Sequence, residues 1–301
     1  MISIVLPVYN GEKNIVNTLE NLAQQSFYDF EVIVVNDGSV DNTQKLIEDF
    51  SKKDSRFKLI NQENQGVASA RNKGVENCRG EFIIHHDSDD TRPLDALEKL
   101  YNKAIETNAD IVMSDYKLTF GNNSKKVVQK FSGTSEELIQ DILVGKFHAG
   151  LWNKLIKKNL YDNLKFEKGI NYMEDKLILI RMLLKKPSIS YVDTVGYNYV
   201  QLPDSITNNL SINSYQSIKK VIEIIENEFI ENNLKFDLTQ TKLKYKLAAI
   251  INDISINHKE EFEEVNSLIF KTKNIALKHK ILLYLELKGI KIISKIFNRL
   301  K

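Results

Sequence analysis

Short apolar runs of strand type alternate with amphipathic helical patterns over the first 115 residues of the chain. The runs are nearly continuous in apolar character, which is typical of strands buried on both faces of a parallel sheet. They lie at Ile2–Val8, Phe30–Val35, Phe57–Ile60, Glu81–His85 and Asp110–Met113. Between them, apolar residues recur at the spacing of a helix face. The alternation predicts an α/β fold with a mostly parallel sheet, flanking helices and right-handed crossovers.

The rest of the chain changes from a mixed to an all-helical pattern. Thr134 and Glu137 form a capping box at the start of one expected helix. A further helix is expected from about Glu174 to Lys186, and strand-type sequence follows at Ile189–Val200. From about residue 213 the apolar residues recur only at the spacing of helix faces. Since a domain averages roughly 150 residues, 301 residues suggest about two domains, and we expect a C-terminal all-helical extension.

Polar and turn-forming residues gather where the predicted strands end. In an open α/β sheet, ligands bind outside the carboxyl ends of the strands. The ends of the first four strands and the loops after them contain, in order, Pro7, Val8, Tyr9 and Asn10; Asn36, Asp37, Gly38 and Ser39; Gln62, Glu63, Asn64, Gln65 and Gly66; and His85, His86, Asp87, Ser88, Asp89 and Asp90. We therefore predict a ligand site at this edge of the sheet.

Three carboxylates, Asp87, Asp89 and Asp90, lie within four residues after the fourth strand. They would repel one another unless a positive group lay between them. Oxygen ligands alone suit Mg²⁺ or Mn²⁺ better than Zn²⁺. The alternative is helix capping, with Asp90 as the cap and Pro93 in the first turn. The two roles are compatible, because Asp90 can cap a helix while Asp87 or Asp89 binds a metal.

Other polar groups at this edge also have a structural alternative. Asp37 before Gly38 suits an ordinary turn, and only its position favours a contact with a base or ribose. Arg71, on the helix after the third strand, either faces a phosphate or an acidic neighbour or is an exposed surface arginine. The pair Glu174-Asp175 either stabilises the N-terminus of its helix by interacting with the helix dipole or supplies a general base across a cleft.

Several signals are absent from the sequence. There is no GxGxxG after the first strand and no GxxxxGK[ST] anywhere, so neither a dinucleotide fingerprint nor a P-loop is present. The phosphates of a nucleotide would need another partner, and a metal held by the acidic cluster would supply one. The formal net charge of +2, from 42 basic and 40 acidic residues, argues against a protein that wraps nucleic acid.

Four ordered segments of the first half-chain carry a specific resemblance. They are IVLPVYN (4–10), EVIVVNDGSVDNT (31–43), NQGVASARNKG (64–74) and HDSDD (86–90). Together they resemble family 2 glycosyltransferases, inverting enzymes with a GT-A fold that use nucleotide-activated sugars. A looser match continues through LWNKL (151–155), MED (173–175) and YNYVQLPDSIT (197–207). The pattern is similar to bacterial transferases that build capsular, O-antigen and other surface polysaccharides.

The resemblance implies a role for each matching residue. Pro7, Tyr9 and Asp37 would line the base and ribose pocket, with Arg71 nearby. Asp87 and Asp89 would be the DxD pair that holds Mn²⁺ or Mg²⁺, and Asp175 would be the catalytic base. Trp152 and Asn153 would shape the sugar or acceptor pocket. The substrate contacts that we assign are Pro7, Val8, Tyr9, Asn10, Asp37, Gly38, Arg71, Asp87, Ser88, Asp90, Trp152, Asn153 and Glu174.

The same resemblance sets the expected domains and reaction. We predict a GT-A domain over residues 1–207, with a nucleotide-sugar half (1–115) and an acceptor and base half (116–207), followed by a helical region (208–301). The enzyme would move a sugar from a nucleotide-diphosphate sugar, a UDP-sugar above all, to a glycan or lipid-linked hydroxyl. His85-His86 stands where the family usually has apolar residues. These histidines would either approach the diphosphate or simply pack against other side chains.

Lysines and one arginine accumulate over residues 271–301, against Glu286 alone. On a helix, Lys288, Lys291, Lys295 and Arg299 share one face, and most apolar residues lie away from it. Such a helix either lies on an anionic membrane surface or packs its apolar side on the preceding helices. A single cysteine, no signal-peptide pattern and no apolar run of about 18 residues predict a cytoplasmic protein, with the inner face of the membrane as an alternative.

Two other classes compete with the glycosyltransferase. A non-catalytic nucleotide-sugar-binding or scaffold subunit would keep the fold, but the presence of Asp87, Asp89 and Asp175 argues against it. A nucleotidyltransferase would need a basic, glycine-rich phosphate loop early in the chain, and none follows the first strand. Nucleic acid is not an expected partner, because the basic run is single, terminal and without interleaved aromatic residues.

Overall fold

The computed structural model describes residues 1–121, 123–201 and 210–290 of the chain. Two compact units are present, Met1–Ile139 with Phe147–Leu202, and Gln140–Lys146 with Pro203–Lys301. The boundary predicted after residue 207 falls outside the described residues, and the division at residue 115 remains a prediction.

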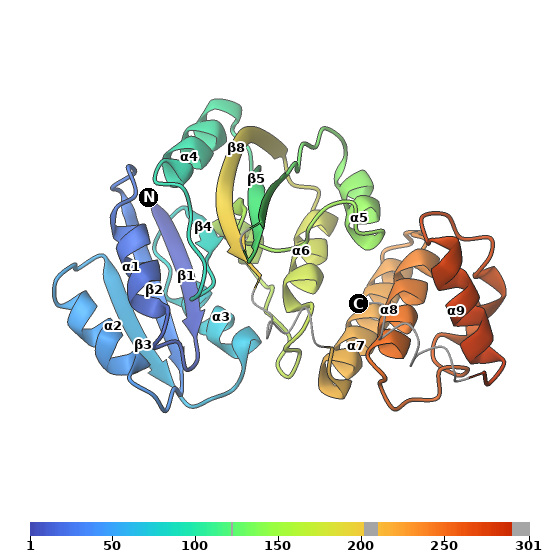
Figure 1. The fold of residues 1–301 in the computed structure, drawn as a ribbon. Coiled ribbons are helices and arrows are strands. Elements are labelled where there is room, and N and C mark those ends of the chain that lie inside the picture. Colours follow the sequence, from blue (N-terminus) through green and yellow to red (C-terminus); the bar gives the residue numbers. More distant parts are fainter. Residues whose placement is uncertain (122, 202–209, 291–301) are drawn as a thin grey trace. The chain divides into compact units, whose positions relative to one another are not determined.

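An eight-stranded sheet is the framework of the first unit (Figure 1). The strand order is β3-β2-β1-β4-β7-β5-β6, and β8 pairs with β5. Strands β3, β2, β1 and β4 run parallel to one another, and β8 runs parallel to β5. The strands are β1 (Ile2–Val8), β2 (Phe30–Asp37), β3 (Phe57–Gln62), β4 (Phe82–His85), β5 (Ile111–Phe120), β6 (Asn123–Val127), β7 (Lys154–Lys157) and β8 (Ile189–Val200). The predicted α/β class with a mostly parallel sheet is confirmed.

Helices cover the sheet because alternate residues of its buried strands point to opposite faces. Ile4, Leu6 and Val34 share one core with apolar residues of α1, α2 and α4. Helix α3 packs on β1 and β2, where Gly74 permits a close approach, because a Cβ there would lie 2.4 Å from a methyl group of Val5. The helices of this unit are α1 (Ile15–Ala23), α2 (Thr43–Ser51), α3 (Val67–Glu76), α4 (Ala96–Thr107), α6 (Glu174–Leu184), the first part of α5 (Ser135–Leu143) and a 3₁₀ turn, η1 (Lys158–Tyr161).

Two strands were not expected from the sequence. Strand β6 forms a hairpin with β5, which extends to Phe120. Strand β7 has only four residues and lies antiparallel between β4 and β5, so it occupies the middle of the sheet. So short a run has no measurable period, and its partners lie far away in the sequence. Local patterning therefore could not identify it.

The second unit consists of helices in its described residues, as predicted. They are α7 (Ile212–Glu231), α8 (Thr239–Ile251), a 3₁₀ helix η2 (Glu263–Leu268) and α9 (Leu277–Leu287), together with the end of α5. The expected stripes are buried, including Ile218, Ile222 and Ile225 on α7 and Leu243 on α8. No helix within the described ranges has the length and apolarity to cross a membrane.

Candidate active site

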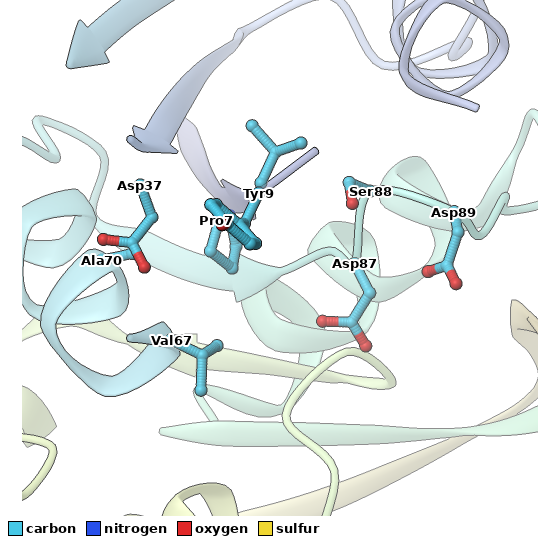
Figure 2. Close-up of a pocket in the computed structure, with 9 residues that line it drawn as sticks. Pro7, Tyr9, Asp37, Val67, Ala70, Asp87, Ser88 and Asp89 are labelled. Carbon is cyan, nitrogen blue, oxygen red and sulfur yellow. The ribbon is translucent and has the colours of Figure 1, made fainter. Parts of the chain in front are cut away.

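A pocket of about 190 Å³ opens at the carboxyl ends of β1, β2 and β4, beside the first turns of α3. The parallel pairing of these three strands brings the loops that follow them to one edge. The pocket is lined by Pro7, Val8, Tyr9, Asp37, Val67, Ala70, Asp87, Ser88 and Asp89. Figure 2 shows Asp37 at one end and the side chains of Asp87 and Asp89 toward the other. Residues from three predicted rim segments therefore meet in one pocket.

Asp37 is tied to the start of α3 through its carboxylate. One oxygen, Oδ1, accepts hydrogen bonds from the Gln65 amide (2.9 Å) and from Gln62 Nε2 (2.7 Å). The other, Oδ2, accepts the Gly66 amide (2.9 Å). Because a carboxylate oxygen has two lone pairs, Oδ2 keeps one acceptor position for a ligand. Asp37 thus has a structural role at the start of α3 and is also one of the residues that line the pocket.

Asn10 and Gly38 shape the pocket without lining it. The Asn10 amide donates to Ser39 Oγ (2.9 Å), and its side-chain oxygen accepts the Val40 amide (2.9 Å), which joins the loops after β1 and β2. Gly38 has φ +73°, and a Cβ there would lie 2.7 Å from the Asn64 nitrogen. The loop pairing places Tyr9, whose side chain is half exposed, at the mouth of the pocket.

The acidic loop, residues 86–90 after β4, directs its three carboxylates two ways. Asp87 and Asp89 line the pocket, whereas Asp90 is buried and accepts the Val200 amide of β8 (2.8 Å). Although the Asp89 side chain is accessible to solvent, the walls of the pocket partly desolvate its carboxyl, and this desolvation and the neighbouring Asp87 both raise the pKa of Asp89. Burial and the same neighbour raise the pKa of Asp90 to about 8. Asp90 therefore does not line the pocket, and its carboxyl contacts the protein backbone.

The donor set of this loop fits a hard divalent cation that shares its ligands with a substrate. No three histidine, cysteine, aspartate or glutamate side chains in the described part of the chain come together to hold a metal ion on their own. Asp89 is exposed, and Asp87 has one oxygen, Oδ1, engaged by Arg71 Nη2 at 3.2 Å. Mg²⁺ at phosphate sites is typically bound by one or two carboxylates, with phosphate oxygens and water completing the shell. Two available carboxylates match that arrangement.

Arg71 connects the acidic loop with the Glu-Asp pair of α6. It is only 7% exposed, and its guanidinium donates to Glu174 through Nη1 and to Asp87 through Nη2. Burial alone would lower the pKa of Arg71, but Glu174 and Asp87 outweigh it and raise that pKa. Of the alternatives for Arg71, the structure supports the acidic neighbour.

The Glu174-Asp175 pair opens α6 after Met173, which has φ +68°. Glu174 is buried against Arg71; its burial raises its pKa to about 7, although the arginine opposes this shift. Asp175 is partly exposed and accepts the amide of Lys176 (2.7 Å). The negative charge of Asp175 raises the pKa of Asp87 and that of Arg71. The pair and the acidic loop are thus close in space, although neither member lines the pocket itself.

Trp152 and Asn153 lie in the interior and not in the pocket. Trp152 stacks on Tyr197 (ring centroids 4.6 Å apart), and Asn153 donates from Nδ2 to the Ser114 carbonyl (2.7 Å). The sequence reasoning missed the residue that follows them, Lys154. This lysine is fully buried, and its ammonium group donates to three oxygens, those of His148 (2.9 Å), Gly150 (2.7 Å) and the Asn153 side chain (2.8 Å). The sequence feature that could have drawn attention to Lys154 is its position inside the motif LWNKL (151–155).

Both histidines before the acidic loop are packed. His85 Nε2 pairs with the Tyr161 hydroxyl (2.9 Å), and His86 Nδ1 pairs with the Asp87 carbonyl (2.8 Å). Burial lowers the pKa of each well below its usual range, with Arg71 and Arg92 respectively adding to the effect. Both are therefore neutral near pH 7, and of the two alternatives for this pair the structure supports packing.

The chain is similar in sequence to several known proteins. Residues 3–183 match the family model described as Glycosyl transferase family 2. The chain is 34% identical over 207 residues to the putative glycosyltransferase EpsH of Bacillus subtilis; the match covers 66% of this chain and 60% of EpsH. It is 27% identical to a Campylobacter jejuni GalNAc(5)-diNAcBac-PP-undecaprenol beta-1,3-glucosyltransferase, over 96% of this chain and 93% of that protein.

Among solved structures, the fold is similar to that of Staphylococcus aureus TarS (residues 1–349) in complex with UDP-GlcNAc. The TM-score is 0.63 at 22% sequence identity, and the likeness covers 97% of this chain and 81% of the TarS chain. At this level of identity the likeness concerns the fold.

Proposed function

The chain belongs to glycosyltransferase family 2, and from that premise we propose that it is an inverting, metal-dependent enzyme of surface-polysaccharide synthesis. It would transfer a sugar from a UDP-sugar to a hydroxyl of a glycan or lipid-linked acceptor. The observation that supports this most is the connection through Arg71 between the pocket loop of Asp87 and the Glu174-Asp175 pair. This connection would link the proposed donor site at Asp87 with the pair that contains the proposed base, Asp175.

The donor would lie along the pocket with its base near Asp37 and its diphosphate near Asp87 and Asp89. The open acceptor position on Asp37 Oδ2 suits a ring N–H of a base such as uracil. The TarS structure named above contains UDP-GlcNAc, which is in keeping with a UDP-sugar here. We propose UDP over the other nucleotides on these grounds.

Asp87 and Asp89 would hold Mn²⁺ or Mg²⁺ together with the diphosphate. When bound, such an ion neutralises charge on the departing diphosphate and orients it. Arg71 would limit the freedom of the Asp87 carboxylate by holding its Oδ1. The loop itself is held by Thr18, whose hydroxyl proton is shared between the Ser88 carbonyl (2.9 Å) and the Asp90 carbonyl (3.2 Å).

Asp175 would act as the general base. It would accept the proton of the acceptor hydroxyl as that oxygen bonds to the anomeric carbon and the bond to the diphosphate breaks on the opposite face. The sugar carbon would therefore invert its configuration. Glu174, engaged by Arg71, is better placed to position the start of α6 than to take the proton.

We propose that α9 binds an anionic membrane surface, the place where a lipid-linked acceptor is found. Leu282 and Leu283 of this helix are buried, whereas Leu277 (65% exposed), Ile281 (44%) and Tyr284 (44%) lie at the surface at i, i+4, i+7 spacing. This part of the chain is basic: residues 271–288 contain five lysines and a single acidic residue, Glu286. The lysines are Lys271, Lys273, Lys278, Lys280 and Lys288. The predicted basic face continues through Lys291, Lys295 and Arg299, which lie outside the described residues. The undecaprenol-linked acceptor in the name of the Campylobacter relative supports this proposal.

A donor screen tests the proposed function. We would measure thermal stabilisation by UDP-, GDP-, CMP- and dTDP-sugars with and without Mn²⁺, and then transfer to lipid-linked acceptors. We expect Mn²⁺-dependent stabilisation by a UDP-sugar, and a product of inverted configuration. Binding without turnover on every acceptor would instead favour a non-catalytic nucleotide-sugar-binding subunit.

Vesicle co-sedimentation tests the membrane contact. Substituting Leu277, Ile281 and Tyr284 by Ser should release the protein from anionic vesicles. The matched control is Ile230→Ser, an exposed apolar residue of α7 (72% exposed), which should bind as wild type does. Equal binding of the α9 variant and wild type would refute the contact.

A further inference from the structure

The hydroxyl of Tyr197 contacts the backbone of the acidic loop. Tyr197 lies on β8 and is fully buried, and its hydroxyl accepts the amide of Asp87 at 3.1 Å. This amide belongs to one of the two proposed metal ligands, yet it is held by a residue 110 positions later in the chain. A side chain outside the pocket therefore bears directly on the position of Asp87.

Further contacts attach the same loop to the end of β8. The Asp90 carboxyl accepts the Val200 amide (2.8 Å) and lies within hydrogen-bonding reach of the Tyr197 hydroxyl. Thr91 and Asn198 form an antiparallel bridge, in which the Asn198 amide donates to the Thr91 carbonyl at 2.9 Å. The loop is thus joined to β8 at both of its ends, and the Tyr197 hydroxyl is the contact nearest to Asp87.

Aromatic and cationic neighbours hold the Tyr197 ring in place. The ring stacks on Trp152 with an angle of 17° between planes, and the His86 ring meets it edge-on at 5.2 Å. The guanidinium carbon of Arg92 lies 5.3 Å from its centroid, and Arg92 Nη2 donates to the His85 carbonyl (3.2 Å). A ring held on several sides can fix the position of its hydroxyl, because it cannot swing away without disturbing these neighbours.

We propose that Tyr197 is a positioning residue for the reaction, which fixes Asp87 in the orientation needed for the metal and diphosphate. This inference rests on the proposed function. Loss of the hydroxyl would leave the partly buried Asp87 amide without its acceptor, and an amide without a partner favours a shift of the backbone. The carboxylate would move with that backbone, whereas Asp37 and the base end of the pocket would stay in place.

Tyr197→Phe isolates the hydroxyl, because it retains the ring and its stacking. The matched control is Tyr116→Phe, since Tyr116 is the register partner of Tyr197 on β5 and also packs against Trp152, at 4.9 Å. No hydrogen bond of its hydroxyl is found within the part of the chain that the structure describes. Two ligands are compared by calorimetry or ligand-observed NMR: UDP with Mn²⁺, which needs the acidic loop, and uridine, which needs only the base end.

We expect Tyr197→Phe to weaken Mn²⁺-dependent UDP binding on the order of tenfold and to leave uridine binding unchanged. Tyr116→Phe should bind both as wild type does. Wild-type affinity of Tyr197→Phe for UDP with Mn²⁺ would overturn the inference, as would an equal loss of uridine and UDP binding, which indicates a general structural role. If wild-type protein itself fails to bind UDP with Mn²⁺, the proposed function fails first, and that result is distinct from either outcome.

Discussion

Arg71 and Glu174 form a buried ion pair between helix α3 and the first turn of α6, 103 residues apart in the sequence. The arginine also binds Asp87, so one cation serves two acidic segments. A buried charge without a partner is costly, and this arrangement makes the positions of the acidic loop and of the Glu174-Asp175 pair depend on each other.

Arg71→Met should destabilise the protein by about 3 kcal/mol, because it leaves the buried Glu174 and the partly buried Asp87 without their cation. Urea unfolding at pH 7.5 measures the effect. The control is Arg79→Met, an exposed arginine just beyond the same helix, which should stay within about 0.5 kcal/mol of wild type. Similar stabilities for the two variants would show that the Arg71 pair contributes little.

The stability of the protein should fall as pH rises from about 4.5 to 7 through the Glu174 carboxyl. Its folded pKa is raised to about 7, mainly by burial, so the folded state binds more protons than the unfolded state in this window. Raising the pH removes that advantage, and the free energy of unfolding decreases on the order of 1–3 kcal/mol. Urea unfolding at pH 5, 6, 7 and 8 should show this slope in wild type and in the exposed-site control Glu76→Gln. Glu174→Gln should lack that part of the slope; an unchanged slope would contradict the assignment.

Asp89→Asn should lower transfer on the order of a hundredfold or more, because the exposed Asp89 is the less encumbered of the two proposed metal ligands. Initial rates as a function of Mn²⁺ concentration check this prediction, with EDTA expected to abolish activity of the wild type. Asp49→Asn, at an exposed position on α2, serves as the control and should be fully active. Wild-type Mn²⁺ activation of Asp89→Asn would remove this residue from the metal site.

Asp175→Asn should retain donor binding but lose about 10²–10⁴-fold in transfer rate, since an amide cannot accept the acceptor proton. Calorimetry with UDP and Mn²⁺ measures the first property, and single-turnover transfer measures the second. Asp162→Asn, an exposed aspartate, is the control. A variant with normal turnover would mean that another group is the base.

Local patterning predicted the elements that carry the pocket, because β1, β2 and β4 are long or strongly apolar enough to be recognised. The motif residues Pro7, Tyr9, Asp37, Asp87 and Asp89 then meet in one pocket because parallel strands end at one edge. The direction of each acid could not be predicted. Asp90 points away because β8, more than 100 residues later, supplies the Val200 amide. Trp152 is likewise drawn inside by Tyr197, a partner that no local pattern indicates.

The insertion of β7 between β4 and β5 has a consequence for biosynthesis. Both of these strands precede residue 121, yet the strand that joins them ends at Lys157. A nascent chain that has emerged only to residue 121 therefore presents an unpaired edge on β4, and such edges are templates for wrong pairing. The middle of the sheet closes only after a long stretch of further synthesis, and β5 gains its partner β8 only at residue 200. Truncations within 121–153 should therefore aggregate far more than those after residue 200.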